Sequence, residues 1–454
     1  MNPRKPANTR LAPTGPHRPK LVQPAALPTQ LVTIEKPIYG GACLARIEGK
    51  AIFVPLTLPG EQARIRIIDD KRGYATAEAE QIVAIAPERI APKCSHFGVC
   101  GGCHYQHTGY EVQLNFKQAI LRETLQRAGV QPPEEIALLS AALPSQTWAY
   151  RNRARLAFDA QGNPGYRGRR SHSVIPIREC PITAPLLVES ARAFADVARK
   201  LHPVLRIAEL SLFCNAGESA LLATVFTTGP TSALFEDMAI AVHDRVPALI
   251  GADLVADGRA DEKPHTIARW GATSLGYRAA GFDYRVDHGA FFQINRWLID
   301  PLVERVTTGH SGKLAWDLFA GVGLFARQLT ASFDRVVAVE SATSAVNALE
   351  QNLHGTTGTA VRASTLDFLR NSRQDDRPDL IVADPPRTGL GPDITARLGH
   401  ISAPALVYVS CDPATLARDL RALLATGYQI ESVTLADLFP QTFHLETVVH
   451  LRRP

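Results

Sequence analysis

The sequence predicts an α/β protein, in which a C-terminal domain with a doubly wound parallel sheet follows a small N-terminal β-barrel and a mixed α+β central domain. Three observations predict this class. The 454 residues exceed what one hydrophobic core usually supports. Short strand patterns with turn residues fill residues 30–87, and strands alternate with helices from about Lys313 onward. We place a basic tail at 1–30, the barrel at 31–87, the central domain at 88–285 and the C-terminal domain at 286–454.

The first 30 residues differ in composition from the rest of the chain. They contain five basic residues, seven prolines and no acidic residue. Such a segment cannot bury enough apolar surface to offset the entropy lost on ordering, so we expect a disordered tail. Its five charges equal the whole formal net charge of +5. Net charge therefore gives no argument about partners of the folded part.

Composition also bears on the compartment. No stretch approaches the ~18 to 20 uninterrupted apolar residues of a membrane span, and the N-terminus lacks the apolar core of a signal peptide. We expect a cytoplasmic protein that does not bind membranes, and we expect it to be a monomer.

Residues 30–87 predict a small antiparallel barrel. The predicted strands are Leu31–Ile34, Ala51–Pro55, Ala63–Asp69 and Ala75–Ile85, with turns at Gly40-Gly41 and Pro59-Gly60. Barrels of this size often hold oligonucleotides, but the barrel alone does not specify a ligand.

A group of three cysteines follows the barrel. Cys94, Cys100 and Cys103 form a C-x5-C-x2-C run with glycines between them, which let the backbone wrap closely around one centre. Cys180, which precedes a proline, can supply a fourth sulfur. In a long cytosolic chain such grouping favours a metal or redox site over disulfides. Four sulfur ligands suit zinc or an iron-sulfur cluster, and the spacing does not separate the two; the centre could also be purely structural.

Within the central domain, a predicted amphipathic helix at Gln113–Ala128 follows the cysteine group, and we expect it to pack rather than to catalyse. An arginine-rich stretch follows at Trp148–Arg178, with aromatic residues between the arginines. Arginines on one strand face, next to aromatics, suit phosphate contacts and base stacking. A solvated strand face explains the same pattern equally well.

The C-terminal domain has the features of an adenosyl-binding sheet. A strand at Leu314–Asp317 runs into a glycine turn and a helix, and the second strand, Arg335–Val339, ends in Glu340. Gly321 and Gly323 allow a ligand to approach the backbone, and an acid at that strand end can accept hydrogen bonds from ribose hydroxyls. The spacing is not G-x-G-x-x-G, which disfavours a nicotinamide cofactor.

Two further acids follow later strands of the same sheet. Asp367 comes after the third strand and can reach an adenine amino group. Asp384 ends the fourth strand, Leu380–Ala383, and two stiff prolines follow it. A helix cap or a solvated loop explains each acid taken singly; their order along the chain favours a ligand site.

A single cysteine marks the edge of the fifth strand. Cys411 follows the apolar strand Ala405–Ser410 and precedes a helix that Pro413 opens. Ligands bind at this edge in open α/β sheets, and a helix N-terminus lowers a thiol's pKa. We therefore interpret Cys411 as a nucleophile, against the alternative of a buried core cysteine.

Four motifs of the C-terminal domain together resemble the RNA uridine-5-methyltransferase family. They are Asp317-Leu-Phe-Ala-Gly-Val-Gly323, Asp384-Pro-Pro-Arg387, Ser410-Cys-Asp-Pro-Ala-Thr-Leu-Ala-Arg-Asp419 and Asp437-Leu-Phe-Pro-Gln-Thr-Phe-His-Leu-Glu-Thr-Val448. Residues 35–41 and 54–61 resemble the TRAM module, an RNA-binding barrel. With the cysteine group, the chain resembles the bacterial 23S rRNA branch of the family over nearly everything after residue 30. Leu324 departs from the pattern, because relatives commonly place a polar residue there.

The resemblance implies a Rossmann-like S-adenosylmethionine methyltransferase domain and a cysteine-based mechanism. Cys411 would add to C6 of a uracil in 23S rRNA, C5 would take the methyl group of S-adenosylmethionine, and Glu446 would remove the C5 proton. The target base would be flipped from its stack. The implied cofactor contacts are Gln293, Phe319, Glu340 and Asp384, with Asp367 as a weaker addition, and the implied ligands of a [4Fe-4S] cluster are Cys94, Cys100, Cys103 and Cys180.

Three alternatives stay open at this point. The substrate could be tRNA, the reaction could be methylation of an exocyclic amine, which needs no thiol, or the protein could be an RNA-binding iron-sulfur protein with an inactive methyltransferase half. The presence of Cys411 and Glu446 together with the cofactor acids argues against an inactive enzyme.

Overall fold

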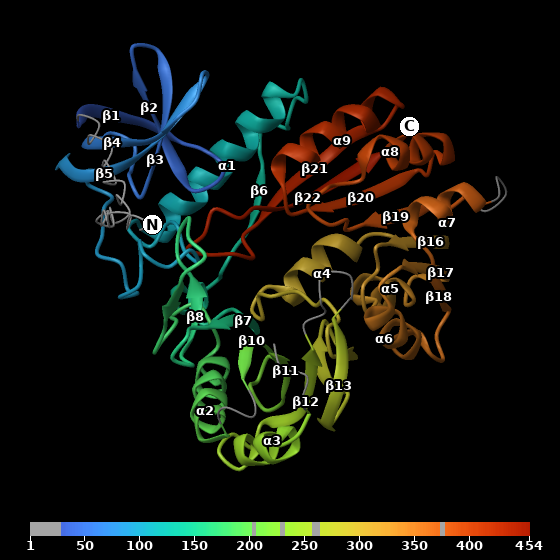
Figure 1. Cartoon of the computed structure of the whole chain (residues 1–454). Helices are drawn as coiled ribbons and strands as arrows, with labels where there is room; N and C mark the ends of the chain where they lie inside the picture. The colour runs from blue at the N-terminus through green and yellow to red at the C-terminus, as the bar shows by residue number, and fades with distance from the viewer. Residues whose placement is uncertain (1–28, 202–205, 228–231, 257–263, 373–376) are drawn as a thin grey trace, which may run out of the picture.

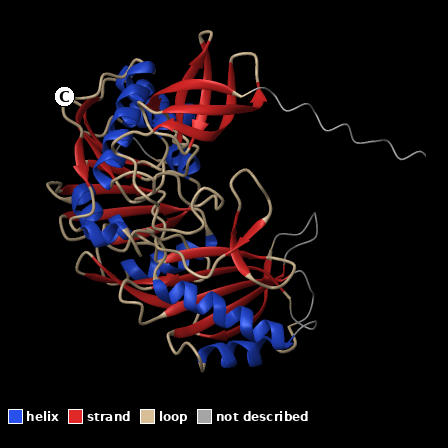
Figure 2. Ribbon diagram, turned by 90° about the vertical axis from the view of Figure 1, so that its left-hand side faces the viewer, coloured by secondary structure: helices blue, strands red, loops and turns tan. Residues whose placement is uncertain are grey.

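The structure is a computed structural model that describes residues 29–201, 206–227, 232–256, 264–372 and 377–454. The predicted basic tail at 1–30 lies almost entirely outside the described residues. Figure 1 shows the N-terminal barrel in blue, a central sheet in green and yellow, and the C-terminal sheet in orange and red. Turned by 90°, Figure 2 shows the barrel and the central sheet at opposite ends, with loop-rich chain between them.

The N-terminal barrel is closed, with strand order β1-β2-β3-β5-β4. Its strands are β1 (Gln30–Pro37), β2 (Ala42–Ile47), β3 (Lys50–Pro55), β4 (Gln62–Asp70) and β5 (Tyr74–Ala84). Alternate apolar residues such as Ile34, Ile52 and Ile65 fill its interior. The predicted barrel is confirmed, with one strand more than the sequence indicated, because β2 was not recognised. It is not purely antiparallel as predicted, because β3 and β5 pair in parallel.

The helix α1 (Tyr110–Arg127) and the short strand β6 (Ala137–Leu139) leave the barrel and join the C-terminal sheet. Leu121 and Leu125 of α1 belong to the same buried cluster as Leu416 and Leu420 of α9 (Pro413–Ala425). β6 pairs in parallel with β21 (Gln429–Ala436). The predicted domain boundaries at residues 88 and 285 stay a prediction. α1 and β6 lie within the predicted central domain, yet they pack on the C-terminal sheet.

The central sheet has seven strands in the order β13-β12-β11-β10-β7-β8-β9. The helices α2 (Pro185–Leu201) and α3 (Phe235–His243) share its hydrophobic core. Its strands are β7 (Arg153–Phe158), β8 (Pro164–Arg167), β9 (Val174–Pro176), β10 (Ile207–Cys214), β11 (Leu221–Thr227), β12 (Leu249–Ala256) and β13 (His265–Gly271), and a 3-10 turn, η1 (Pro144–Thr147), precedes them. This sheet matches the predicted mixed α+β central part. A hairpin, β14 (Ser274–Ala279) and β15 (Phe282–Asp287), packs on α6 (Thr343–Leu353), a helix of the C-terminal sheet.

The C-terminal sheet has eight strands in the order β18-β17-β16-β19-β20-β22-β21-β6. The first five are parallel, and β22 is antiparallel to β20 and β21. Its remaining elements are α4 (Ile299–Thr307), β16 (Gly312–Leu318), α5 (Leu324–Leu329), β17 (Phe333–Glu340), α6 (Thr343–Leu353), β18 (Gly358–Arg362), α7 (Thr365–Asn371), β19 (Leu380–Ala383), α8 (Gly391–Ile401), β20 (Ala405–Ser410) and β22 (Glu446–Arg452). Strand order reverses at β16, which lies between β17 and β19. The carboxyl ends of these strands are where such folds bind ligands.

No helix within the described ranges is both long enough and apolar enough to cross a membrane.

Candidate active site

Cys411 and Glu446 lie next to each other at the carboxyl edge of the C-terminal sheet. Cys411 directly follows β20, and Glu446 is the first residue of β22. These antiparallel strands pair Ser410 with Thr447, so the next residues outward on the same ladder are Cys411 and Glu446. Glu446 is buried and Cys411 is partly exposed. A thiol and a carboxyl group are therefore neighbours at the edge where ligands bind.

The helix after Cys411 begins with a side-chain cap. Asp412 Oδ1 accepts hydrogen bonds from the amides of Ala414 and Thr415, each at 3.0 Å. The Asp412 carboxylate, rather than the Cys411 thiol, therefore interacts with the positive end of the α9 helix dipole.

The pKa of Cys411 is raised to about 12, and the sequence-based expectation of a lowered value is wrong. Burial is the largest cause, the charges of Glu446 and Asp384 add to it, and Arg387 opposes them. Burial and then the charge of Asp384 also raise the pKa of Glu446 well above its ordinary value. Burial raises the pKa of Asp384 to about 7. In the free protein the thiol is therefore protonated at neutral pH.

A pocket with about 330 Å³ of empty space adjoins this pair. The residues that line it are Phe291, Phe292, Gln293, Phe319, Ala320, Gly321, Val322, Leu324, Phe325 and Asp384. Gln293 Nε2 donates to Asp384 Oδ2 at 3.3 Å, so two predicted cofactor contacts meet directly. Leu324 gives this wall an apolar surface. Aromatic walls with a carboxyl group at one end suit a flat ring attached to a cation.

Glu340 and Phe319 shape the turn at the floor of this pocket. Gly321 N donates to Glu340 Oε2 at 2.8 Å, while the amides of Ser341 and Ala342 donate to Oε1. Phe319 adopts a left-handed φ of 62°, which a non-glycine residue takes only where the surrounding structure holds it. Glu340 thus fixes the turn through its carboxylate and lies at the end of β17, beside the pocket.

Asp317 is a buried acid that the sequence analysis noted only as part of a motif. Its Oδ2 accepts from Ala326 N at 2.8 Å, and its Oδ1 is buried without a partner in the described part of the chain. Burial raises its pKa to about 8, and the charges of Asp384 and Glu340 add to this. Three acids therefore cluster around the glycine turn.

Asp367 lies apart from these residues. It is in the first turn of α7, where its amide donates to the capping Ser364 Oγ and its carboxylate accepts from that hydroxyl at 2.6 Å. Its side chain is 64% exposed, and it does not line the pocket. The visible role of Asp367 is helix capping, and its contact with a cofactor stays a prediction.

An aromatic group that the sequence analysis missed lies beside Cys411. The Phe443 ring contacts Tyr39 of the barrel, His104 of the cysteine segment and His444, with centroid distances of 5.4, 4.6 and 4.3 Å. Arg387 Nη2 lies 3.1 Å from His444 Nδ1. We call Tyr39, His104, Phe443 and His444 the aromatic bridge. Its members come from three distant segments, so no local pattern could have revealed it.

Buried hydrogen bonds hold the loop that leads into Glu446. Lys117 Nζ donates to Asp437 Oδ1 at 2.5 Å and to Phe439 O at 3.0 Å, and both charged side chains are fully buried. Gln113 exchanges hydrogen bonds with the side chain and amide of Gln441 at 3.0 and 2.9 Å. Two further donors reach the same loop, Tyr150 to Pro440 O and Asn295 to Leu438 O. α1 therefore helps to position a predicted catalytic residue.

Comparisons with known proteins agree with this geometry. A family model for tRNA (Uracil-5-)-methyltransferase matches residues 270–454, and a TRAM domain model matches residues 28–79. The chain is 31% identical to the 23S rRNA (uracil(1939)-C(5))-methyltransferase RlmD of Pseudomonas entomophila, over 92% of each chain. It is 33% identical to an uncharacterized RNA methyltransferase of Streptomyces avermitilis, over 91% of this chain and 95% of that one.

The chain belongs to the RNA uracil-C5-methyltransferase family. The predicted activity class, the Rossmann-like methyltransferase domain and the TRAM barrel are confirmed. The fold also matches the Pyrococcus abyssi tRNA (uracil-54, C5)-methyltransferase, solved in complex with S-adenosyl-L-homocysteine, with a TM-score of 0.74, 22% identity, and coverage of 93% of this chain and 100% of that one.

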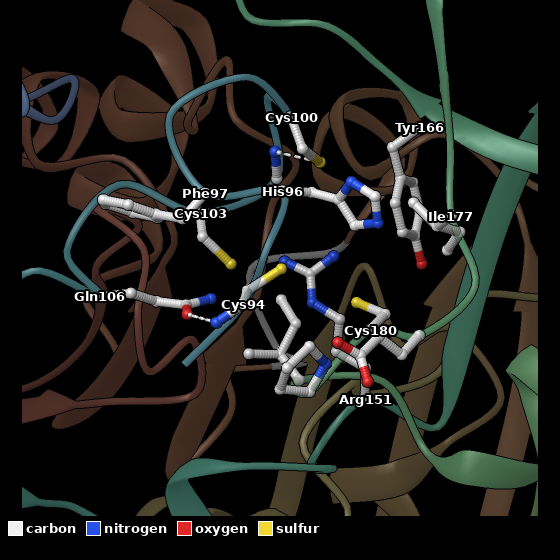
Figure 3. Close-up of a pocket in the computed structure, with 14 residues that line it drawn as sticks. Cys94, His96, Phe97, Cys100, Cys103, Gln106, Arg151, Tyr166, Ile177 and Cys180 are labelled. Atoms are coloured by element: carbon white, nitrogen blue, oxygen red, sulfur yellow. Dashed lines mark hydrogen bonds between the residues drawn. The ribbon is translucent and has the colours of Figure 1, made fainter. Parts of the chain in front are cut away.

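The four predicted cysteines of this uracil-C5-methyltransferase line one cavity with about 490 Å³ of empty space. Figure 3 shows Cys94, Cys103 and Cys180 pointing toward the guanidinium of Arg151. Burial raises the pKa of Cys103 to about 12. Across the described ranges, no three His, Cys, Asp or Glu side chains are close enough to form a ready metal site. The structure therefore brings the cysteines together and does not itself show a cluster.

The arginine-rich stretch of the methyltransferase divides into internal and surface residues. Arg153 Nη2 donates to Ala290 O at 2.7 Å and its guanidinium packs over Phe213, while Arg155 and Arg167 both pair with Glu209. These three arginines are already partnered. The predicted phosphate contacts can therefore involve only part of the stretch.

Proposed function

We propose that this enzyme uses S-adenosylmethionine to methylate C5 of one uridine in 23S rRNA, through a temporary bond between Cys411 and C6. The observation that carries the proposal is the adjacency of Cys411 and Glu446 beside a pocket that contains Asp384. A thiol nucleophile and a carboxyl base at one strand edge are what C5 methylation needs, since C5 of uracil is a weak nucleophile until a thiol adds to C6.

The pocket that Phe319 and Asp384 help to line suits an adenosyl sulfonium. Gln293, Phe319, Glu340 and Asp384 are the residues that would hold it, and an acid with its pKa raised to about 7 gains from a neighbouring cation. S-adenosylmethionine supplies an electrophilic methyl group when bound. Asp384 beside Gln293 would orient the charged end, and the aromatic wall would exclude water from it.

The protons of the reaction can be followed on the protein's own groups. The Cys411 thiol passes its proton to water as sulfur adds to C6, and C5 becomes enolate-like. After methylation, the Glu446 carboxylate takes the C5 proton, the C5–C6 double bond re-forms, and sulfur leaves as a thiolate. That thiolate regains a proton readily, because the pKa of Cys411 is raised to about 12, first by burial. One proton is released for each methyl group transferred.

The choice of 23S rRNA rests on relatives. RlmD of Pseudomonas entomophila, named for uracil 1939 of 23S rRNA, is similar over nearly its whole length, and so is RlmD of Klebsiella pneumoniae at 30% identity over 93% of that chain. The second candidate substrate is tRNA, because the matching family model bears that description. Both candidates use the same chemistry at the same site.

A [4Fe-4S] cluster on Cys94, Cys100, Cys103 and Cys180 is also part of the proposal. The cavity presents four sulfurs around Arg151, which makes no ion pair with the described part of the chain. A cation in a cavity is costly without an anion, and a centre held by four thiolates is anionic. The four cysteines therefore fit a centre that is held by four thiolates. The resemblance to the family favours an iron-sulfur cluster over zinc.

The proposed function is tested with two variants. Cys411→Ala should abolish methyl transfer, whereas Glu446→Gln should accumulate a covalent protein–RNA complex that resists denaturing electrophoresis. Methylated uridines are mapped in 23S rRNA and tRNA from cells with and without the protein. Turnover by Cys411→Ala would exclude the thiol mechanism, and a methylated exocyclic amine in the product would assign the other chemistry.

A further inference from the structure

The cysteine cavity contains a buried amide that lacks an acceptor. Gln106 lines this cavity and is only 2% exposed, and its Nε2 is buried with no hydrogen-bond partner in the described residues. Its Oε1 accepts from Cys94 N at 2.9 Å, which fixes the plane of the amide (Figure 3). A buried N–H group without an acceptor is unfavourable, so this donor indicates an acceptor that binds in the cavity.

Arg151 is the second polar group of the cavity without full compensation. Its guanidinium lies among three of the four sulfurs in Figure 3. Of its side-chain nitrogens, only Nε has a hydrogen-bond partner in the described chain, the Tyr150 hydroxyl at 3.4 Å. Glu179 also lines the cavity, but it is exposed and, across the described ranges, does not pair with Arg151. The positive charge therefore calls for an anion inside the cavity.

Tyr150 holds Arg151 in this position. Its ring is fully buried, and its hydroxyl donates to Pro440 O at 3.0 Å. The guanidinium packs over this ring, 5.8 Å from its centroid, and the Arg151 amide donates to Ile182 O at 3.0 Å. Because the ring and the backbone fix one side of Arg151, its two terminal nitrogens stay available to the cavity.

Two of the four sulfurs already accept hydrogen bonds from the protein. Gly102 N donates to Cys100 Sγ at 3.4 Å, and Thr183 Oγ1 donates to Cys180 Sγ at 3.2 Å. Such donors orient the thiolates that hold a metal and withdraw negative charge from the sulfurs. The unpartnered donors line the same cavity, so they extend an arrangement that two cysteines already have.

We propose that Gln106 and Arg151 are positioning residues of the metal centre that the four cysteines hold. Gln106 donates a hydrogen bond to this centre, and Arg151 balances its negative charge. A centre with four thiolate ligands is anionic, and a cation at its edge offsets that charge. The inference rests on the proposed function, because it assumes a tetrathiolate centre in the cavity, but it holds for zinc and for iron-sulfur alike.

Three variants and one control test the two roles. Gln106→Glu keeps an oxygen that accepts from Cys94 N and replaces the unpartnered nitrogen by a second oxygen. Arg151→Met removes the charge at similar length, and Arg151→Lys restores it. Arg155→Met, at an exposed arginine that pairs with Glu209, is the control. The full-length proteins are purified without oxygen, and release of the bound metal into a chromogenic chelator is followed by absorbance.

We expect Gln106→Glu and Arg151→Met to release metal roughly tenfold faster than the unmodified protein, with Arg151→Lys between them and the control unchanged. If the centre contains iron, Arg151→Met should also lower its reduction potential, because loss of a cation disfavours the added electron. A tenfold change in that equilibrium is about 59 mV for one electron.

The melting temperature separates a charge role of Arg151 from a purely structural one. With metal bound, Arg151→Met should melt below the unmodified protein; without metal it should melt at the same temperature or above, because an uncompensated cation has been removed. A lower melting temperature in both states, or a lysine variant that releases metal as fast as Arg151→Met, would overturn the charge role.

Two further outcomes separate this inference from the proposed function. Release rates of Gln106→Glu and Arg151→Met equal to that of Arg155→Met would overturn the inference and leave the metal centre in place. An unmodified protein that contains neither iron nor zinc after anaerobic purification would instead remove the centre itself from the proposed function.

Discussion

The Cys411 sulfur is surrounded by groups that oppose its ionisation. Burial and two acids raise its pKa to about 12, and Arg387 is the opposing charge. The free enzyme therefore keeps this thiol, the proposed nucleophile, protonated and unreactive. A cation bound beside Asp384 would offset one of these acids, which would couple thiol activation to occupancy of the pocket.

This arrangement predicts the alkylation behaviour of the thiol. Modification of Cys411 by iodoacetamide should be slow at pH 8 and should accelerate up to the highest pH at which the enzyme stays folded. Asp384→Asn removes a negative charge next to the thiol, so the pKa of Cys411 should fall and alkylation at pH 9 should be roughly three- to tenfold faster, since one pKa unit changes the thiolate fraction tenfold. Peptide mass spectrometry measures the rate, and Asp367→Asn on the exposed turn of α7 is the control. A slower reaction of Asp384→Asn would contradict this account.

Individual site residues could be predicted to different degrees. Cys411 and Asp384 directly follow apolar strands, so their place at the sheet edge followed from the strand pattern. Glu446, the first residue of β22, was implied only by the resemblance to the family. The raised thiol pKa did not follow, because it depends on acids that come from other strands. Arg387 and the aromatic bridge act through contacts between distant segments, which no local pattern encodes.

Among the secondary-structure elements, α1 has more influence on the site than its pattern suggested. The sequence predicted an amphipathic helix that packs, yet its charged residue Lys117 is fully buried against Asp437. Burial lowers the pKa of Lys117, and the charge of Asp437 raises it. The helix was predictable from its apolar spacing, but the buried lysine was not, because its partner lies in the C-terminal domain.

The buried pair predicts a large and asymmetric effect on stability. Lys117→Met should lower the free energy of unfolding by about 3–5 kcal/mol, because it leaves Asp437 buried without its cation. The double variant Lys117→Met with Asp437→Leu should be more stable than Lys117→Met alone. Denaturant midpoints measure the difference, and Arg278→Met, which breaks the exposed pair with Asp283, should cost about 0–1 kcal/mol. If the double variant is as unstable as Lys117→Met alone, the unpaired charge of Asp437 is not the cause of the lost stability.

On the scale of the whole molecule, the cysteine segment connects otherwise separate parts. The amides of His104 and Tyr105 both donate to Gln441 O, at 2.9 and 3.0 Å, within the loop that precedes Glu446. The barrel touches the same region through Tyr39. A metal centre in the neighbouring cavity would therefore stabilise the contact between the barrel and the loop that precedes Glu446.

Removal of the metal should reveal this connection. Protein purified without oxygen is expected to be brown with broad visible absorbance, and loss of the metal should lower the melting temperature and expose residues 94–107 to proteolysis. Cys180→Ser should lower iron content, whereas Cys214→Ala, at a buried cysteine outside the cavity, should not. A colourless protein with stoichiometric zinc would replace the iron-sulfur assignment by a zinc one.

The order of sheets along the chain was predictable because barrel and parallel-sheet patterns differ in period and turn content. The arrangement of β6 was not, since three residues carry too little pattern to assign a strand, and its pairing partner is nearly 300 positions away.

That pairing has a consequence for biosynthesis. As the ribosome releases the chain, the apolar side of α1 and the edge of β6 emerge long before α9 and β21, which cover them. Until then these surfaces stay open to wrong associations, as is common when native contacts join distant parts of a long chain. We therefore expect chaperones to bind the nascent chain. We also expect truncated chains that end before β21 to be insoluble.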